Sequence, residues 1–162
     1  MIRAVCRTLF AVALAVVLVT PVAIAGDNPG ELSFAGSLYN PKDGGTSYSL
    51  RSEYLAPLGH LYLGPSGEIF DGPGTDGGAV GIAGEVHLGK KCGPGFGGAA
   101  HKLFGDAADN AAYTYEVRAL FECGTESAAF KATARQVWSR AEDGATEEPD
   151  GTRVDAGVVW RF

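Results

Sequence analysis

The sequence predicts an all-β protein: an eight-stranded, antiparallel, up-and-down β-barrel whose strands span a membrane. Three observations lead to this prediction. Polar and apolar residues alternate in eight runs after an apolar N-terminal segment, and clusters of Gly, Asp, Asn and Pro separate the runs. Most runs are 9 to 12 residues long, close to the roughly 9–11 residues that a tilted strand needs to cross a bilayer. The 24 glycines follow no collagen-like period and stand among alternating apolar residues, which favours an all-β fold rich in turns. The length of 162 residues favours a single domain.

The first element, residues 1–25, has the layout of a secretory signal peptide. Arg3 and Arg7 precede an apolar run from Leu9 to Val19, and the segment ends in the small-residue sequence Ala-Ile-Ala. We expect cleavage after this sequence, which leaves 26–162 as one barrel domain. An uncleaved N-terminal membrane anchor is the alternative, although the apolar run is short for a spanning helix.

The charge balance bears on possible partners. The formal net charge is −6, and removal of the signal peptide would take two arginines from it. An acidic chain lacks the basic face that phosphate binding needs, so we expect no nucleic-acid partner. We also expect no cofactor, because the sequence contains no phosphate loop, heme motif or metal-ligand spacing.

The eight runs define the expected strands. In chain order they are Glu31–Tyr39, Thr46–Ala56, His60–Phe70, Ala79–Gly89, Phe96–Phe104, Ala111–Glu122, Ala128–Arg140 and Arg153–Phe162. The fifth run alternates least clearly. If Phe96 and Phe104 face lipid, Lys102 does too, near the outer rim where its side chain can reach water; a β-bulge is the alternative.

One face of the runs is almost entirely apolar. It comprises Leu32, Phe34, Leu38, Tyr48, Leu50, Tyr54, Leu61, Leu63, Ile69, Val80, Ile82, Val86, Leu88, Tyr113, Tyr115, Val117, Ala119, Phe121, Phe130, Ala132, Ala134, Trp138, Val154, Ala156, Val158, Trp160 and Phe162. Its aromatic residues gather toward the strand ends, with Tyr48, Tyr113 and Trp138 at one end and Tyr54, Phe121, Phe130, Trp160 and Phe162 at the other. Two aromatic belts around an apolar band indicate a surface that faces lipid.

The other face carries acids and bases in near balance. We expect a lumen charge network of Arg51, Glu53, Glu85, His87, Glu116, Arg118, Lys131, Arg135 and Asp155, joined by Glu31, Glu68, Glu122, Arg153 and Arg161. His60 and Tyr62 share this parity. An eight-stranded barrel has an interior only wide enough for side chains, so the charges should pair across it and plug the lumen.

The connections alternate between two sets. One set is Ala56–Gly59, Gly89–Gly95 and Cys123–Ser127, and the other is Asn40–Gly45, Asp71–Gly78, Gly105–Asn110 and Ala141–Thr152. In an outer-membrane barrel the short turns face the periplasm and the longer loops face outside, so we expect the second, longer set on the outside. This set is rich in acids, which predicts an acidic outer rim. Two interpretations of these acids remain open: they attract divalent cations that bridge lipopolysaccharide headgroups, or they are simply solvated caps.

Two cysteines remain after the signal peptide, Cys92 and Cys123, each in one of the turns of the first set. They are placed symmetrically about the Gly105–Asn110 loop, so an antiparallel hairpin would set them opposite each other. The export signal implies an oxidising compartment, which favours a disulfide over two free thiols.

The chain ends on an aromatic residue within its last strand, where Trp160 and Phe162 follow Val154, Ala156 and Val158 at alternate positions. This ending resembles the small bacterial outer-membrane β-barrels, most closely the eight-stranded OmpA/OmpX type. The resemblance implies that Trp160 and Phe162 form an assembly signal read by the barrel-assembly machinery, with periplasmic chaperones acting during biogenesis. It also implies contact with outer-membrane lipids and lipopolysaccharide in a diderm bacterium, and we expect a monomer.

The expected function is an envelope-structural or surface-interaction role without catalysis. A lipid A acylase or deacylase is one alternative, because Glu85 and His87 share a face and His60 and His101 lie on the flanking strands. The His-x-Ser pairing that we associate with deacylase barrels is missing. A small porin is the second alternative, and a soluble secreted β-barrel is the third.

Overall fold

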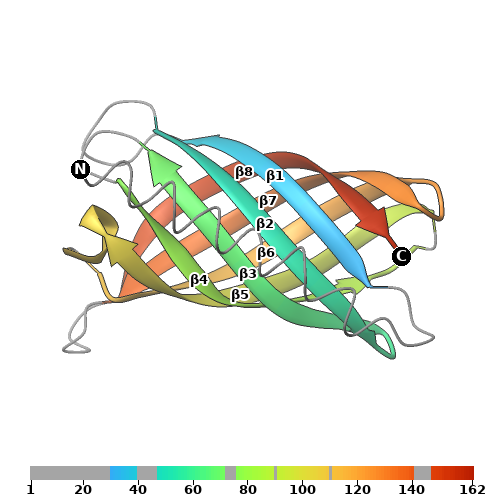
Figure 1. The fold of residues 1–162 in the computed structure, drawn as a ribbon, viewed down its shortest axis with the longest axis horizontal. Helices are drawn as coiled ribbons and strands as arrows, with labels where there is room; N and C mark the ends of the chain where they lie inside the picture. The colour runs from blue at the N-terminus through green and yellow to red at the C-terminus, as the bar shows by residue number, and fades with distance from the viewer. Residues whose placement is uncertain (1–29, 40–46, 72–75, 90, 110, 141–146) are drawn as a thin grey trace.

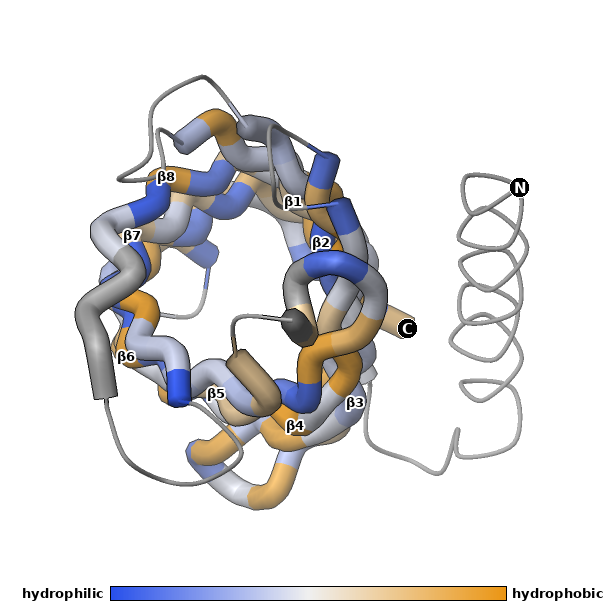
Figure 2. Tube along the Cα trace, turned by 90° about the vertical axis from the view of Figure 1, so that its left-hand side faces the viewer, coloured by the Kyte–Doolittle hydropathy of each residue, from blue (hydrophilic) through white to orange (hydrophobic). Residues whose placement is uncertain are grey.

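The computed structural model describes residues 30–39, 47–71, 76–89, 91–109, 111–140 and 147–162. The predicted signal peptide lies outside these residues. Eight antiparallel strands close into a barrel in chain order, with the first strand paired to the last. Figure 1 shows the tilted strands from the side, and Figure 2 shows the closed ring along the barrel axis. No helix within the described ranges is long and apolar enough to cross a membrane.

The described part of the barrel includes one short helical element, and the two ends of the barrel differ. The strands are β1 (Glu31–Tyr39), β2 (Ser47–Leu58), β3 (Leu61–Asp71), β4 (Gly77–His87), β5 (Cys92–Gly105), β6 (Tyr113–Gly124), β7 (Ala128–Arg140) and β8 (Glu147–Arg161), and the 3-10 helix η1 is Asp106–Asp109. We call the end with the β2–β3, β4–β5 and β6–β7 connections the turn end, and the opposite end the loop end. The predicted fold class of eight antiparallel strands in a closed barrel is confirmed.

Some predicted strand limits were wrong, because residues typical of turns continue the ladders. β5 begins at Cys92 rather than Phe96, and the Cys-Gly-Pro-Gly sequence there pairs with β6. β8 begins at Glu147 rather than Arg153, so half of the expected Ala141–Thr152 loop belongs to the strand, with a register shift in β7 at Val137/Trp138. The part of that loop at 141–146 lies outside the described residues.

The β2–β3 hairpin is tighter than predicted. Leu58 pairs with Leu61 across a two-residue connection, and Gly59 takes a φ of 71° in it, which favours glycine in such a turn. His60 is therefore an exposed turn residue and not a lumen residue. The prediction that His60 lies on the charged face was wrong. The strand was expected to begin at His60, but β3 begins one residue later at Leu61, so His60 is not part of the strand pairing.

The outer wall is apolar, as the alternation predicts. Ile82 and Val117 are exposed in the middle of their strands, Phe121 and Trp160 near the turn end, and Tyr48 near the loop end. The less regular β5 keeps an unbroken register with both neighbours. Its Phe96 and Lys102 are exposed while His101 points inward and is buried, so the expected outward position of Lys102 is confirmed and a bulge is not needed.

Two residues of the predicted lipid-facing set are covered. Leu32 and Tyr54 pair with each other in the β1–β2 ladder, and both are buried. The Tyr54 ring lies against the backbone of Gly30, where an added Cβ would be only 2.6 Å from the Tyr54 hydroxyl oxygen. Of the aromatic residues predicted for the turn-end belt, Phe121, Phe130, Trp160 and Phe162 are exposed and Tyr54 is not.

A small apolar cluster occupies the lumen at the loop end. Ala79, Leu103 and Ala111 form its buried part, and Phe70 and Ala108 pack against them. Ala108 belongs to η1, which lies at the loop end in Figure 1. The cluster and η1 were not predicted, and they place packed side chains above the charged part of the lumen.

Candidate functional site

The interior of the barrel holds a continuous network of ion pairs. The predicted members Arg51, Glu53, Glu85, Glu116, Arg118, Lys131, Arg135 and Asp155 are all buried, and His87 is partly buried. Each alternates along its strand with outward-facing residues, so the period of two along the sequence places the charges on the inner wall. Glu31, Glu68, Glu122 and Arg153 are buried with them.

The loop-side tier of the network is built around two arginines. Arg135 reaches Glu116 Oε2 at 2.8 Å through Nη1 and Asp155 Oδ2 at 2.9 Å through Nε. It also donates from Nη1 to Glu68 Oε2 at 2.7 Å. Arg51 pairs with the same Glu116 and Asp155, at 2.8 and 2.9 Å. Shared carboxylates thus tie β2, β6, β7 and β8 together across the lumen.

Arg153 completes this tier at the loop end. Its Nη1 is 3.8 Å from Glu68 Oε1. Its guanidinium carbon lies 4.0 Å from the centroid of the Tyr39 ring and 5.3 Å from that of Phe70, positions typical of cation–π contacts. The tier therefore contains three bases, Arg51, Arg135 and Arg153, and three acids, Glu68, Glu116 and Asp155.

The middle tier balances two bases with two acids. Arg118 contacts Glu53 Oε1 at 2.7 Å and Glu85 Oε1 at 3.0 Å. Lys131 Nζ lies 2.6 Å from both oxygens of Glu85 and 3.9 Å from Glu53 Oε2. Gly97 gives this tier its space, because an added Cβ would lie 2.9 Å from Glu85 Cγ and 3.2 Å from Arg118 Nε.

The turn-end tier, which we call the mouth cluster, consists of Glu31, His87, Glu122 and Arg161. Arg161 Nε donates to Glu31 Oε1 at 2.8 Å, and its Nη2 forms an ion pair with Glu122 Oε1. A single arginine thus holds two buried glutamates through one oxygen of each. Unlike the other two tiers, the mouth cluster has one more acid than it has arginines or lysines.

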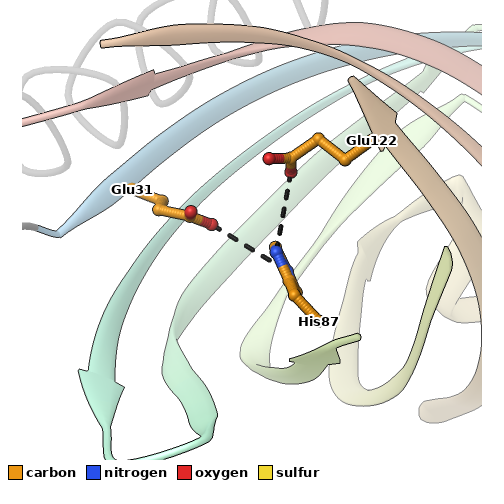
Figure 3. A group of neighbouring side chains, drawn as sticks. All are labelled: Glu31, His87 and Glu122. Carbon is orange, nitrogen blue, oxygen red and sulfur yellow. Dashed lines mark ion pairs between the residues drawn. The ribbon is translucent and has the colours of Figure 1, made fainter. Parts of the chain in front are cut away.

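His87 stands opposite the two glutamates, as Figure 3 shows. Its Nε2 is 4.0 Å from Glu31 Oε2, and its Nδ1 is 3.9 Å from Glu122 Oε2. The same Nε2 is 3.1 Å from Glu85 Oε2, which connects the mouth cluster to the middle tier. The imidazole also stacks on Tyr62, with ring centroids 4.8 Å apart. The His87 side chain is 12% exposed to solvent, so small solutes can reach the cluster from the turn end.

One polar pair was missed by the sequence analysis. His101 Nε2 lies 3.0 Å from Ser66 Oγ, and Ser66 Oγ donates to Glu53 Oε1 at 3.2 Å. Ser66 was not predicted because its run contains Gly and Pro, which weaken the alternation. The three residue types match a nucleophile triad, but the acid contacts the serine, whereas a triad needs the acid on the histidine. Ser66 and His101 are both buried at 4% exposure, so this pair contributes to lumen packing.

The predicted disulfide is confirmed. Cys92 and Cys123 are bonded and are direct partners in the β5–β6 ladder. Their placement in turns was wrong, since both lie in strands. The cross-link joins the turn-side ends of β5 and β6, which places it near the mouth cluster residue Glu122.

The C-terminal aromatics both face outward. Trp160 is partly exposed and makes an edge contact with Phe34 on the neighbouring β1, with ring centroids 5.8 Å apart. Phe162 is exposed, and its backbone N–H donates to the carbonyl of Gly30 at 3.1 Å. The last residues therefore pair with the beginning of β1 as well as presenting rings on the outer wall.

No protein-family model matches the chain, and a search of curated proteins finds no match to it.

Proposed function

We propose that the protein is a small integral outer-membrane β-barrel of a diderm bacterium, with an envelope-structural or surface-interaction role and no catalytic activity. Lipids and lipopolysaccharide are its surroundings, and the barrel-assembly machinery and periplasmic chaperones are its partners during biogenesis.

The observation that carries this proposal is the distribution of polarity across the barrel wall. Large apolar side chains, among them Ile82 and Val117, are exposed in mid-wall positions, whereas arginines and glutamates fill the interior. A water-soluble barrel buries its apolar side chains and solvates its charges. An apolar wall of this extent is rare on soluble monomers and is what the hydrocarbon of a bilayer selects.

The tiers of ion pairs and the apolar cluster at the loop end support a lumen that does not conduct. Water and ions would have to displace paired charges such as Arg135 and Glu68 to pass. Breaking such buried pairs is costly, because it leaves charges without partners. The proposed role therefore depends on the barrel's outer wall and rims.

Membrane fractionation of cells that express the full chain tests the proposal. We expect the protein in the outer-membrane fraction, soluble only with detergent, and migrating faster on a gel without boiling than after boiling. A refolded protein that stays soluble without detergent would instead favour a secreted soluble barrel.

Two assays on the purified protein separate the remaining functions. In planar bilayers we expect conductance at background, and a clear single-channel conductance would favour a small porin. With purified lipid A we expect no deacylation or acyl transfer, and turnover would favour an enzyme.

A further inference from the structure

The mouth cluster contains two acceptor atoms that no described residue satisfies. Glu31 Oε2 and Glu122 Oε2 are buried and have no hydrogen-bond partner among the residues that the structure describes. The two glutamates are only 3% and 5% exposed. Buried carboxylate oxygens are normally satisfied, and leaving them bare is unfavourable. Both atoms point toward His87 (Figure 3), so the unsatisfied positions converge on one place.

Arg161 explains why the same atom is left free on each glutamate. It binds the Oε1 atom of Glu31 and of Glu122. The two Oε2 atoms stand 4.0 and 3.9 Å from His87 nitrogens, which is too far for hydrogen bonds. The arginine thus fixes both carboxylates while leaving a gap between them and the imidazole.

The described residues do not balance the charge of the cluster. The loop-side tier pairs three bases with three acids and the middle tier pairs two with two. Among the residues that the structure describes, Arg161 is the one arginine or lysine paired with Glu31 and Glu122. With a neutral His87, one negative charge remains in a largely buried position. A bound cation would compensate it.

His87 is held as metal-ligating histidines usually are. An ionised carboxylate can only accept hydrogen bonds, so in the 3.1 Å contact with Glu85 Oε2 the proton is on His87 Nε2. In the neutral ring this leaves the Nδ1 lone pair directed toward the gap beside Glu122. A carboxylate on the far nitrogen is the usual support of a histidine that binds a metal.

We propose that Glu31, His87 and Glu122 form a binding site for a divalent transition-metal ion, with Zn²⁺ the representative ion. One ligand atom from each of the three lies within 4.8 Å of the others. Ligands of a tetrahedral zinc at 2.0–2.2 Å stand about 3.4 Å apart, so the widest ligand pair must close by about 1.4 Å, which is roughly 0.7 Å for each atom. The fourth position opens to the turn end and takes water. Imidazole favours such an ion over Mg²⁺ or Ca²⁺. The site does not depend on the proposed membrane location.

Zinc binding to the purified, chelator-treated full barrel tests the site. We expect one Zn²⁺ per chain by calorimetric titration. X-ray absorption at the zinc edge should show one nitrogen and two or three oxygen neighbours at about 2.0–2.1 Å and no sulfur. Because both measurements use the wild-type protein, they decide the question even if a variant fails to fold. Absence of saturable binding, or a sulfur neighbour, would overturn the proposal.

Matched variants identify the ligands. We expect His87→Ala to weaken Zn²⁺ binding at least tenfold, while His60→Ala, which removes an exposed histidine at the same end of the barrel, leaves it unchanged. Likewise Glu122→Gln should weaken binding, and Glu126→Gln, at an exposed glutamate of the β6–β7 turn, should not. Equal losses in the paired variants, or full binding by His87→Ala, would refute the assignment. Heat-modifiable migration verifies the fold of each variant.

Discussion

At the scale of single residues, stability depends on whether a charge is shared or isolated. Arg135 contacts three carboxylates inside the barrel, whereas Lys91 meets Glu126 at 3.7 Å on the surface, where the two side chains are 68% and 90% exposed. The desolvation of Arg135 is already compensated by its partners, so its removal leaves several acids bare. Lys91 and Glu126 lose little water when they approach each other.

Arg135→Met should therefore destabilise the barrel strongly. We expect the free energy of unfolding to fall by about 3–5 kcal/mol, measured by urea titration of the refolded protein. Lys91→Met is the control, with an expected change below about 1 kcal/mol. Similar small changes in both variants would mean that the interior ion pairs contribute little to stability.

The charged residues could be predicted from the sequence, but their partners could not. Parity placed Arg51, Glu116 and Asp155 on the inner wall correctly. Which of them touch depends on strand tilt and register around a closed ring, and these follow from the whole set of strands. The mouth cluster illustrates this, because Glu31 and Arg161 are 130 positions apart in the chain and meet only through closure.

At the scale of elements, the β5–β6 hairpin is held by both its ladder and a covalent bond. Its symmetry was visible in the sequence because Cys92 and Cys123 flank the connecting loop evenly. The limits of β5 were not, since a Cys-Gly-Pro-Gly sequence normally indicates a turn. Pairing with β6 on one side overrides that local preference.

Loss of the disulfide should destabilise the barrel through the unfolded state. The bond closes a segment with a sequence separation of 31, for which the chain-entropy model gives about 3–4 kcal/mol. We expect Cys92→Ser/Cys123→Ser to lower the free energy of unfolding by this amount. Reductant should destabilise the wild type to the same level and leave the double variant unchanged. A further effect of reductant on the variant would contradict this account.

The absence of a side chain on Gly97 allows β4 and β5 to approach each other closely. A Cβ on Gly97 would lie 2.3 Å from the carbonyl oxygen of Gly84, whereas one on Gly36 would have its nearest neighbour at 3.8 Å. We expect Gly97→Ala to lower the free energy of unfolding by about 1–3 kcal/mol through overpacking. Gly36→Ala should change it by less than about 0.5 kcal/mol. Comparison of denaturant midpoints measures both, and equal midpoints would show that the strands shift apart without cost.

At the scale of the whole molecule, the wall separates an apolar exterior from a charged interior. The number of strands and their two faces could be predicted from the period of two in the sequence, because every strand has one face on the outer wall and one in the lumen. The loop-end cluster around Leu103 and the covering of Tyr54 did not follow, since both depend on where non-strand segments lie. Irregular segments carry no such period.

For the proposed bilayer location, depth in the bilayer should determine the effect of charge on the outer wall. Ile82 lies in the middle of β4 and Leu38 near the loop end of β1, and their exposed fractions are similar, 61% and 70%. In phospholipid vesicles we expect Ile82→Arg to destabilise the barrel by about 2–4 kcal/mol and Leu38→Arg by about 0–1 kcal/mol. Equal tolerance of both changes would indicate that water, not lipid, surrounds the wall.

The pairing of β1 with β8, closed by the Phe162 amide on Gly30, joins the two ends of the described chain. During synthesis β1 is made first, and it has no partner on that edge until β8, the last strand, has been made. Until then the nascent sheet has two unprotected edges able to recruit foreign strands. A truncated product lacking β8 should accordingly be removed by proteases or aggregate, and a chaperone that shields β1 would have to release it only after translation ends.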